Sequence, residues 1–319
     1  MPVKLNVLIT GASGFIGQAL AAELKNKEGY RIVTASRKST GSQEGIEHRK
    51  HDLLDLAVIP ALEDIDVVVH TAARVHVMDD LALDKLAAYR EANVIGTVAL
   101  ANAAANGGVK RFIFLSSIKV NGEETAPGRA FNAFDIPDPK DEYGISKLEA
   151  EVALRDIEKR TGMQVVVIRP PLVYGPGVKA NFREMMKWLT KGIPLPLGAI
   201  NNQRSLLAIA NLIDLLVVCC VHPNAGGETF LASDGRDIST SELLRNMGRL
   251  LGRQCILVPV PASLLTLTCI MIGKRAIANR LCNSLRLDID HTCIRLNWCP
   301  PVSLEEGLSI AATAFKAEL

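Results

Sequence analysis

The chain has 319 residues, of which 48% are hydrophobic and 22% charged, and its formal net charge is +2. This is ordinary globular composition, enough for one large domain or two coupled ones. A charge so close to neutral gives no reason to expect nucleic acid as a partner. The start of the chain leads directly into the first expected strand, so we expect no signal peptide and a cytoplasmic protein. All seven cysteines lie after residue 218 without C-x-x-C spacing, which indicates buried free thiols and no metal site.

A glycine-rich turn between the first strand and the first helix organises the N-terminal half. Leu5 to Ile9 is an apolar run typical of a strand buried on both faces of a parallel sheet, and Gln18 to Lys27 has a helical pattern. Between them, Gly11, Gly14 and Gly17 give G-x-x-G-x-x-G spacing. Glycines permit a tight turn and the close approach of a pyrophosphate, and the helix N-terminus offers free N–H groups. The stretch predicts nucleotide binding, with an ordinary strand–helix turn as the alternative.

The end of the second expected strand, Arg31 to Ala35, bears on the choice of cofactor. Ser36 stands where an NAD-binding fold usually has an acidic residue for the ribose 2′-hydroxyl, and Arg37 and Lys38 follow it. An arginine at this place suits the 2′-phosphate of NADP, although a solvated basic turn would have the same sequence. We therefore expect NADP(H) to be preferred, with NAD(H) as the alternative.

Further short apolar runs alternate with helical patterns, which predicts a doubly wound parallel sheet of Rossmann type. The expected strands are Ile46 to Arg49, Asp66 to His70, Arg111 to Leu115 and Gln164 to Ile168. His70 is expected to be a core histidine. Residues expected at the cofactor because they follow strand ends are Asp52, Leu53, Thr71, Ala72 and Ala73. Asp52 could meet the adenine end of the cofactor or cap a following helix.

A tyrosine and a lysine four residues apart are the first candidates for catalysis. Tyr143 and Lys147 open a helix that continues to Arg160, and their spacing places both side chains on one face. A lysine cation beside a phenol lowers the phenol pKa, which would make Tyr143 a usable acid or base. An ordinary surface pair is the alternative. The fifth expected strand runs into Ser116 and Ser117, and a loop leads from there to Tyr143.

Beyond residue 170 the sequence becomes richer in proline and glycine. This change predicts a dinucleotide-binding domain over residues 1–170, to which a strand near 228–232 returns, and a smaller C-terminal α/β substrate lobe over 171–319. Within the lobe, Ser263 to Gly273 is the longest apolar run, too short to span a bilayer. We expect it to form a buried or partner-facing helix, with peripheral membrane contact as the alternative.

Together these motifs resemble the extended short-chain dehydrogenase/reductase superfamily of nucleotide-sugar epimerases, dehydratases and ketoreductases. Thr10 to Gly17 is similar to its dinucleotide fingerprint, Asn93 to Thr97 to its helix motif, and Leu296 to Gly307 to its C-terminal signature. The resemblance covers essentially the whole chain and implies a homodimer, formed through the helices that contain Asn93 and Tyr143.

The resemblance also implies roles for single residues. Tyr143 would be the general acid/base, Lys147 would hold the nicotinamide ribose, and Ser117 would bond the sugar oxygen. Arg204, joined by Arg280, would grip the nucleotide diphosphate. The other implied cofactor contacts are Gly11, Ser13, Gly14, Phe15, Ile16, Gly17, Asn93 and Pro170, and the other implied substrate contacts are Lys119 and Asn181.

Within the superfamily, Pro170 to Phe182 most resembles bacterial 4-ketoreductases and 4-epimerases of UDP-N-acetyl-hexosamines, which serve O-antigen synthesis. The expected reaction is reduction of the 4-keto group of a UDP-linked 6-deoxy-N-acetyl-hexosamine by NAD(P)H. The alternative is an NAD-dependent UDP-sugar 4-epimerase of the UDP-glucose or UDP-N-acetylglucosamine type. Ile118 and Lys119 stand where dehydratases have an acidic pair, which disfavours dehydration, and Asn121 replaces a tyrosine usual in the superfamily.

Overall fold

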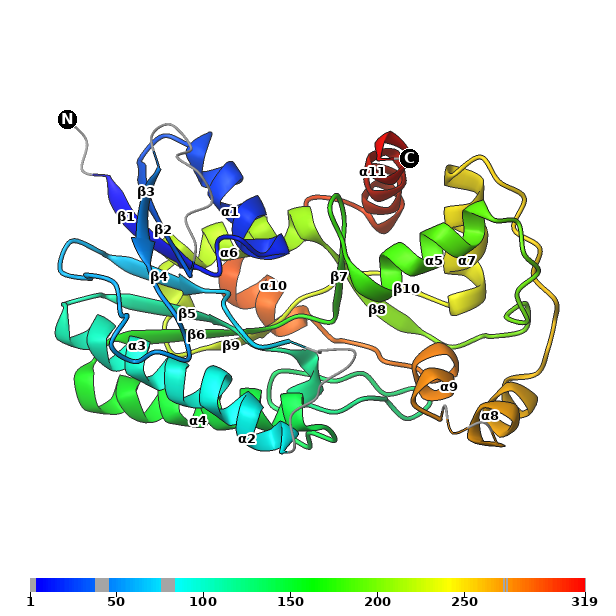
Figure 1. The fold of residues 1–319 in the computed structure, drawn as a ribbon, viewed down its shortest axis with the longest axis horizontal. Coiled ribbons are helices and arrows are strands. Elements are labelled where there is room, and N and C mark those ends of the chain that lie inside the picture. The colour runs from blue at the N-terminus through cyan, green and yellow to red at the C-terminus, as the bar shows by residue number, and fades with distance from the viewer. Residues whose placement is uncertain (1–3, 38–45, 76–83, 272, 274, 319) are drawn as a thin grey trace.

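The computed structural model describes residues 4–37, 46–75, 84–271, 273 and 275–318, with the side chains of 180, 181, 275 and 276 left out. Its larger part is a seven-stranded sheet of order β3-β2-β1-β4-β5-β6-β9, in which all neighbouring strands run parallel (Figure 1). The strands are β1 (Leu5–Thr10), β2 (Tyr30–Ser36), β3 (Glu47–Lys50), β4 (Val67–His70), β5 (Arg111–Leu115), β6 (Gln164–Arg169) and β9 (Thr229–Leu231). The predicted Rossmann-type fold is confirmed, and β9 is the expected returning strand.

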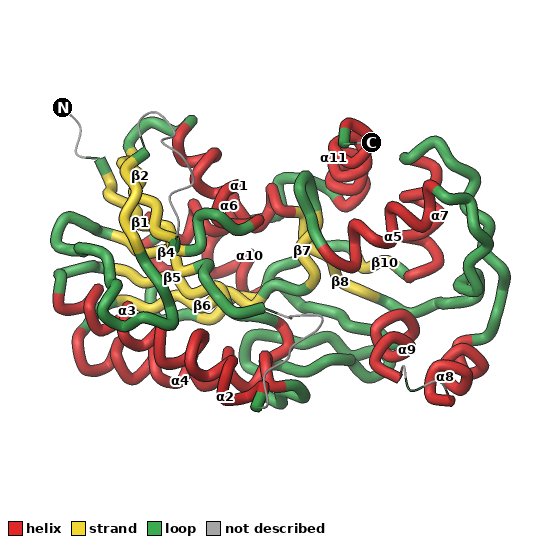
Figure 2. The backbone as a smooth tube through the Cα atoms, viewed as in Figure 1, coloured by secondary structure: helices red, strands yellow, loops and turns green. Residues whose placement is uncertain are grey.

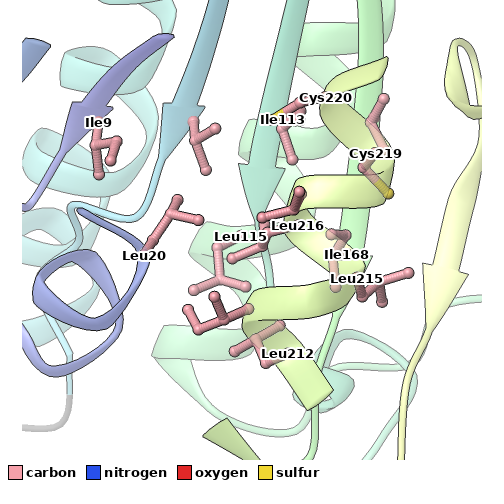
Figure 3. Close-up of a cluster of buried hydrophobic side chains, with 14 of the residues drawn as sticks. Ile9, Leu20, Ile113, Leu115, Ile168, Leu212, Leu215, Leu216, Cys219 and Cys220 are labelled. Carbon is pink, nitrogen blue, oxygen red and sulfur yellow. The ribbon is translucent and has the colours of Figure 1, made fainter. Parts of the chain in front are cut away.

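Helices cover both faces of this sheet because its central strands are apolar on both sides, whereas the edge strand β3 is polar. α1 (Phe15–Lys25) and α6 (Ile209–Val221) bury their apolar faces on one side. Leu20 of α1 and Leu212 and Leu216 of α6 gather over Ile113 and Ile168 of the sheet (Figure 3). The other face is covered by α3 (Gly96–Asn106) and α4 (Glu142–Thr161). The helix motif at Asn93 to Thr97 lies in a continuous helical stretch made of α2 (Lys85–Arg90), a π-helical turn (Glu91–Ile95) and α3.

The smaller lobe has its own sheet and its own core. Its strands β7 (Leu172–Tyr174), β8 (Arg204–Ala208) and β10 (Asp237–Ile238) pair in the order β10-β8-β7. α5 (Ala180–Thr190), α7 (Thr240–Leu250) and α11 (Leu304–Ala317) pack around them. α8 (Ala262–Met271) and α9 (Arg275–Cys282) lie at the outer end of the lobe (Figure 1). α10 (Asp290–Leu296) packs back against the larger sheet through β9.

Three expectations about local structure hold only in part. Residues 51–66, all of them described, form turns and irregular chain with no helix, so of the two roles weighed for Asp52 helix capping is excluded. No residue of α8 is buried, which excludes a buried helix there. Cys299 is exposed, whereas Cys219 and Cys220 are in the core as expected. In the described part of the chain, no helix is both long enough and apolar enough to cross a membrane.

The loop between β5 and α4 links the two parts of the molecule. It runs without regular structure over most of its length (Figure 2). The backbone N–H of Thr125 donates to the carbonyl of Ser284, and the N–H of Phe131 donates to that of Arg286, both at 2.8 Å. The segment leading from α9 to α10 is thereby held beside the carboxyl end of the large sheet, where the strand order reverses between β1 and β4. In open α/β sheets, ligands bind in the crevice at such a reversal.

Candidate active site

The glycine turn between β1 and α1 has the shape that a pyrophosphate requires. Gly11 has a φ of 70°, where a side chain would strain the backbone. A Cβ there would also lie 2.7 Å from the backbone N of Ala72, so there is no space for one. A Cβ on Gly17 would collide with the carbonyl O of Gly11, which explains the close packing of α1 on the turn. Gly14 is the N-cap of α1 and has no side-chain cap. The first N–H groups of α1 are therefore left for an anion, and the turn fits the dinucleotide that the sequence predicts.

The residues expected around this turn lie in three neighbouring places. Ser13 is exposed on the turn, and Phe15 and Ile16 are half-buried in the first turn of α1. Thr71 follows β4, and its hydroxyl donates to the carbonyl of Thr10 at 2.7 Å, which joins the ends of β4 and β1. Ala72 and Ala73, also half-buried, continue from Thr71 beside the turn. These residues line the point where the strand order reverses.

The end of β2 carries no carboxylate. Ser36 is buried as the last residue of β2, its carbonyl accepts from the N–H of His51, and exposed Arg37 follows it. Asp52 accepts from the N–H of Leu54 at 3.1 Å, so it closes a turn. The prediction about Lys38 lies outside the described residues.

Asn93 occupies the π-helical turn and is 1% exposed. Its side-chain oxygen accepts from the N–H of Arg74 at 2.8 Å, and its side-chain nitrogen donates to the carbonyl of Arg74 and the hydroxyl of Ser146, both at 3.0 Å. Asn93 therefore ties the chain after β4 to α4. Leu53, another residue expected at the cofactor, packs against the start of α3. A Cβ on Gly96, three residues after Asn93, would collide with the carbonyl O of Leu53.

His70 is a core histidine, as expected. Its ring is fully buried and is bonded on both nitrogens, to Thr10 at 2.7 Å and to Thr97 at 3.0 Å. It stacks on Phe114 with ring centres 5.9 Å apart. Burial lowers its pKa well below the ordinary value, with Lys147 adding to the effect. A neutral, fully bonded ring has no free position for acid–base chemistry.

A glycine lets the helix that carries Tyr143 pack closely on the turn after Ser117. Ser117 follows β5 and caps the short 3-10 helix η2 (Ile118–Val120), its hydroxyl accepting from the N–H of Lys119. The first turn of α4 packs on η2. A Cβ on Gly144 would lie 2.8 Å from the carbonyl O of Lys119. Glycine after Tyr143 thus lets α4 approach the turn that follows Ser117.

Lys147 is held beneath Tyr143 on the same face of α4. Its side chain is 2% exposed, and its Nζ donates to the carbonyl of Leu115 at 2.9 Å. The Nζ lies 4.4 Å from the ring centre of Phe114 and 5.9 Å from that of Tyr143. Burial lowers the pKa of Lys147 from 10.5 to about 7, opposed by the negative charge of Glu151. The lysine is therefore easier to deprotonate than an exposed lysine.

The expected lowering of the Tyr143 pKa is wrong for this structure. Burial raises the pKa of the phenol well above its ordinary value, and the charges of Asp141 and Tyr89 act in the same direction. The Tyr89 ring meets the Tyr143 ring edge-on at 5.9 Å, which adds to the desolvation. Lys147 directs its ammonium to Leu115 and is itself readily deprotonated, so it does not offset this burial.

A buried ion pair below the lysine was not predicted from the sequence. Arg169, the last residue of β6, donates two hydrogen bonds to Glu151 of α4 at 3.0 and 2.5 Å. Ser116 donates to the same carboxylate, and Arg169 also donates to Asn121 at 2.9 Å. The Glu151 carboxylate counters the positive charge of Lys147. The i, i+4 spacing of Lys147 and Glu151 could have placed Glu151 near the lysine, but no local pattern pairs Glu151 with Arg169, 18 residues away.

Lys119 and Pro170, predicted to contact substrate and cofactor, make contacts within the protein. The ammonium of Lys119 is paired with Asp141, the N-cap of α4, and with Glu123 at 3.5 Å. In this structure Lys119 thus secures the start of the catalytic helix. The carbonyl of Pro170 accepts from the N–H of Ile118 at 3.0 Å, joining β6 to η2. The side chain of Asn181 lies outside the described part.

Arg204 and Arg280 lie close enough for their charges to repel. Arg204 opens β8, and its Nη1 donates to the carbonyl of Asn283 at 3.0 Å. Its pKa is lowered by burial and further by the charge of Arg280, which is exposed on α9. Two neighbouring guanidinium groups favour an anion between them, and a diphosphate suits their planar, forked geometry.

Comparison with known proteins gives consistent results. Residues 7–232 match the model of the NAD dependent epimerase/dehydratase family. The chain is 46% identical over 314 residues to a UDP-glucose 4-epimerase of Vibrio cholerae, covering 97% of this chain and 95% of that protein. It is 27% identical over 257 residues to N-acetyl-alpha-D-glucosaminyl-diphospho-ditrans,octacis-undecaprenol 4-epimerase of Escherichia coli O157:H7, covering 78% of this chain and 73% of that protein.

Solved structures show the same fold. The UDP-glucuronic acid 4-epimerase of Bacillus cereus, in complex with UDP-glucuronic acid and NAD, superposes with a TM-score of 0.80 at 23% identity, covering 99% of this chain and all of that one (100%). With the glycine turn, the Ser117, Tyr143 and Lys147 set and a family match over most of its length, this chain is an enzyme of the NAD-dependent epimerase/dehydratase family.

Proposed function

We propose that the protein is a 4-epimerase that inverts the C4 hydroxyl of a UDP-linked sugar of the UDP-glucose or UDP-N-acetylglucosamine type. The observation that carries this proposal is the 46% identity, over nearly the whole chain, to the UDP-glucose 4-epimerase of Vibrio cholerae. Net reduction of a 6-deoxy 4-keto sugar, the first expectation from the sequence, is not confirmed. The alternative weighed beside it, epimerisation, is better supported.

The residues of the site can perform both half-reactions of an epimerase. Bound NAD supplies a nicotinamide that accepts a hydride from C4 and returns it. Tyr143 takes the proton of the C4 hydroxyl as the hydride leaves and gives it back as the hydride returns, while Ser117 bonds the same oxygen. The raised pKa of Tyr143 makes its phenolate a strong base for taking the C4 proton in the first half, and its phenol a weak acid in the second. Lys147, on the same face of α4, would position the ribose of the cofactor.

The two arginines support a nucleotide-linked substrate. Arg204 and Arg280 come from the smaller lobe, whereas Ser117 and Tyr143 come from the larger sheet and its helix. A diphosphate held by the arginines would place the attached sugar toward the catalytic groups across the crevice. The structural neighbour from Bacillus cereus was solved with a UDP-sugar and NAD, which agrees with this arrangement.

One observation favours a second candidate, a 4-ketoreductase that uses NADPH. The end of β2 presents Ser36 and exposed Arg37 and no carboxylate. A reductase must exchange its cofactor in every cycle, and an arginine here suits the 2′-phosphate of NADPH. Binding of NADPH much tighter than NADH, lost in Arg37→Ala, would support this candidate.

We also propose a homodimer formed through α3 and α4, with a role in surface-polysaccharide synthesis. The outward sides of these helices expose apolar Ile95, at the end of the π-helical turn, and Val152 of α4. Val152→Glu should shift the sedimentation coefficient from that of a dimer to that of a monomer. An unchanged coefficient would refute this interface.

The activity is tested with purified protein and NAD. UDP-glucose and UDP-N-acetylglucosamine are incubated separately, and the C4 configuration of each product is read by NMR. The proposal predicts the C4 epimer without net reduced cofactor. Tyr143→Phe should abolish the conversion, whereas Tyr89→Phe, which removes a hydroxyl from the ring beside Tyr143, is the matched control and should retain it. The proposal would be contradicted if the enzyme formed no epimer from either substrate and instead oxidised NADPH when given a UDP-4-keto-6-deoxy sugar.

A further inference from the structure

The chain has a strongly asymmetric distribution of charge. Between Leu243 and Leu287 there is no Asp or Glu, whereas the segment contains Arg245, Arg249, Arg253, Lys274, Arg275, Arg280 and Arg286. These 7 positive charges, set against a net charge of +2, leave −5 for the rest of the chain. Arg286 is ion-paired with Asp237, and the other positive residues of this block favour a partner of negative charge.

The most apolar helix of the smaller lobe lies inside this positive segment. α8 contains no charged residue, and none of its residues is buried. Leu264, Leu267 and Met271 are spaced three and four residues apart and share one face, and they are 50%, 55% and 78% exposed. α8 packs on α9. Its outer face therefore has no partner among the described residues.

The chain leading into α8 extends this surface. Ile256 and Val258 are exposed at alternate positions, while Leu257 between them pairs with Leu195. Arg249 and Arg253 are exposed just before them. Residues 252–271 run along the outer edge of the smaller lobe, on the side away from the large sheet (Figure 1). We call residues 252–271, together with Arg249 in the last turn of α7, the outer-edge segment.

We propose that the outer-edge segment is a docking surface for the headgroup layer of an anionic phospholipid membrane. α8 has ten residues and is about 15 Å long, too short to span a bilayer but long enough to lie in its interface. Its exposed leucines and methionine would enter the boundary of the acyl chains, and the arginines would meet the lipid phosphates. A second copy of the chain fits less well, because a symmetric contact would bring two positive segments together.

The test is flotation of the full-length protein with vesicles of phosphatidylcholine alone or mixed with phosphatidylglycerol, at low and at high salt. We expect binding to the anionic vesicles to exceed binding to phosphatidylcholine by on the order of tenfold at low salt and to fall at high salt. The triple variant Leu264→Gln, Leu267→Gln, Met271→Gln should lose this binding. Arg249→Gln with Arg253→Gln should weaken it by on the order of tenfold.

The matched control is Ile136→Gln with Ile294→Gln. It removes two exposed apolar side chains, 88% and 82% exposed, that lie outside the outer-edge segment. The control should bind vesicles as the wild type does. The thermal unfolding midpoint shows whether each variant is folded, and Leu267→Gln alone, expected to weaken binding partially, replaces the triple variant if that one unfolds. The proposal is overturned if the wild type ignores anionic vesicles, or if the folded α8 variant floats as the wild type does. It is also overturned if the α8 variant changes only the sedimentation coefficient, which would assign the face to self-association.

Discussion

Replacing Lys147 by Met tests the electrostatics of the site through the pH dependence of stability. The lysine is 2% exposed and its pKa is about 7, against 10.5 for the ordinary group, because burial disfavours the charge. Between these two values the unfolded chain binds more protons at this position than the native protein. As the pH rises from about 7 to 10.5, this group therefore raises the unfolding free energy of the wild type. Below about pH 7 the lysine is protonated in both states and adds no further pH dependence.

The size of the effect follows from the shift. At about 1.4 kcal/mol per pKa unit, the whole window corresponds to about 5 kcal/mol, and the part between pH 7 and pH 9 to about 2 kcal/mol. Lys147→Met removes the titrating group and the hydrogen bond to Leu115, and loss of that bond does not depend on pH. The unfolding free energy of the wild type should thus rise by about 2 kcal/mol relative to the variant between pH 7 and pH 9.

Urea denaturation at a series of pH values measures this difference, because the other titrating groups are common to both proteins. Lys159→Met, an exposed lysine on the same helix, is the control and should run parallel to the wild type. If the Lys147→Met curve is also parallel, the lysine is not held with a lowered pKa and the reasoning is refuted.

Three further outcomes are expected. Tyr143→Phe should lower turnover by about two to four powers of ten with NAD affinity intact by calorimetry, and near-normal turnover would exclude Tyr143 as the acid/base. Arg204→Ala should raise KM for the UDP-sugar by about tenfold to a hundredfold while NAD binding is unchanged, and an unchanged KM would remove Arg204 from the substrate site. Glu151→Gln should cost about 3–5 kcal/mol of unfolding free energy because it leaves the buried Arg169 charge without a carboxylate. Glu149 is half-buried and pairs with exposed Arg90 at the surface, so Glu149→Gln should cost less than about 1 kcal/mol, and equal costs would contradict the burial argument.

The glycine turn, the Tyr143 and Lys147 pair and the type of sheet could be predicted because each depends on residues close together in the sequence. Gly11 and Gly17 could be recognised because backbone contacts forbid a side chain at both positions, and their spacing is visible in the chain. The shared face of Tyr143 and Lys147 follows from helical spacing alone. The doubly wound parallel sheet follows from the alternation of strands and helices.

The rest depended on contacts between distant residues. The pairing of Lys119 with Asp141, 22 residues away, has no local signature and turned a predicted substrate contact into a bond at the start of α4. The pKa of Tyr143 depends on how fully α2 and α4 desolvate it, and spacing carries no information about that. The choice between a buried and an exposed α8 stayed open because an apolar helix has the same sequence pattern whether it is covered by protein or by lipid.

The central claim is that the hydride removed from C4 returns to C4 within one cofactor-bound complex. UDP-glucose or UDP-N-acetylglucosamine carrying deuterium at C4 tests this most directly, with the product analysed by NMR and mass spectrometry. We predict that the C4 epimer keeps its deuterium and that no reduced cofactor accumulates. Loss of the deuterium from the product, or one reduced cofactor consumed for each sugar converted, would show that the enzyme carries out net oxidation or reduction and would contradict the account.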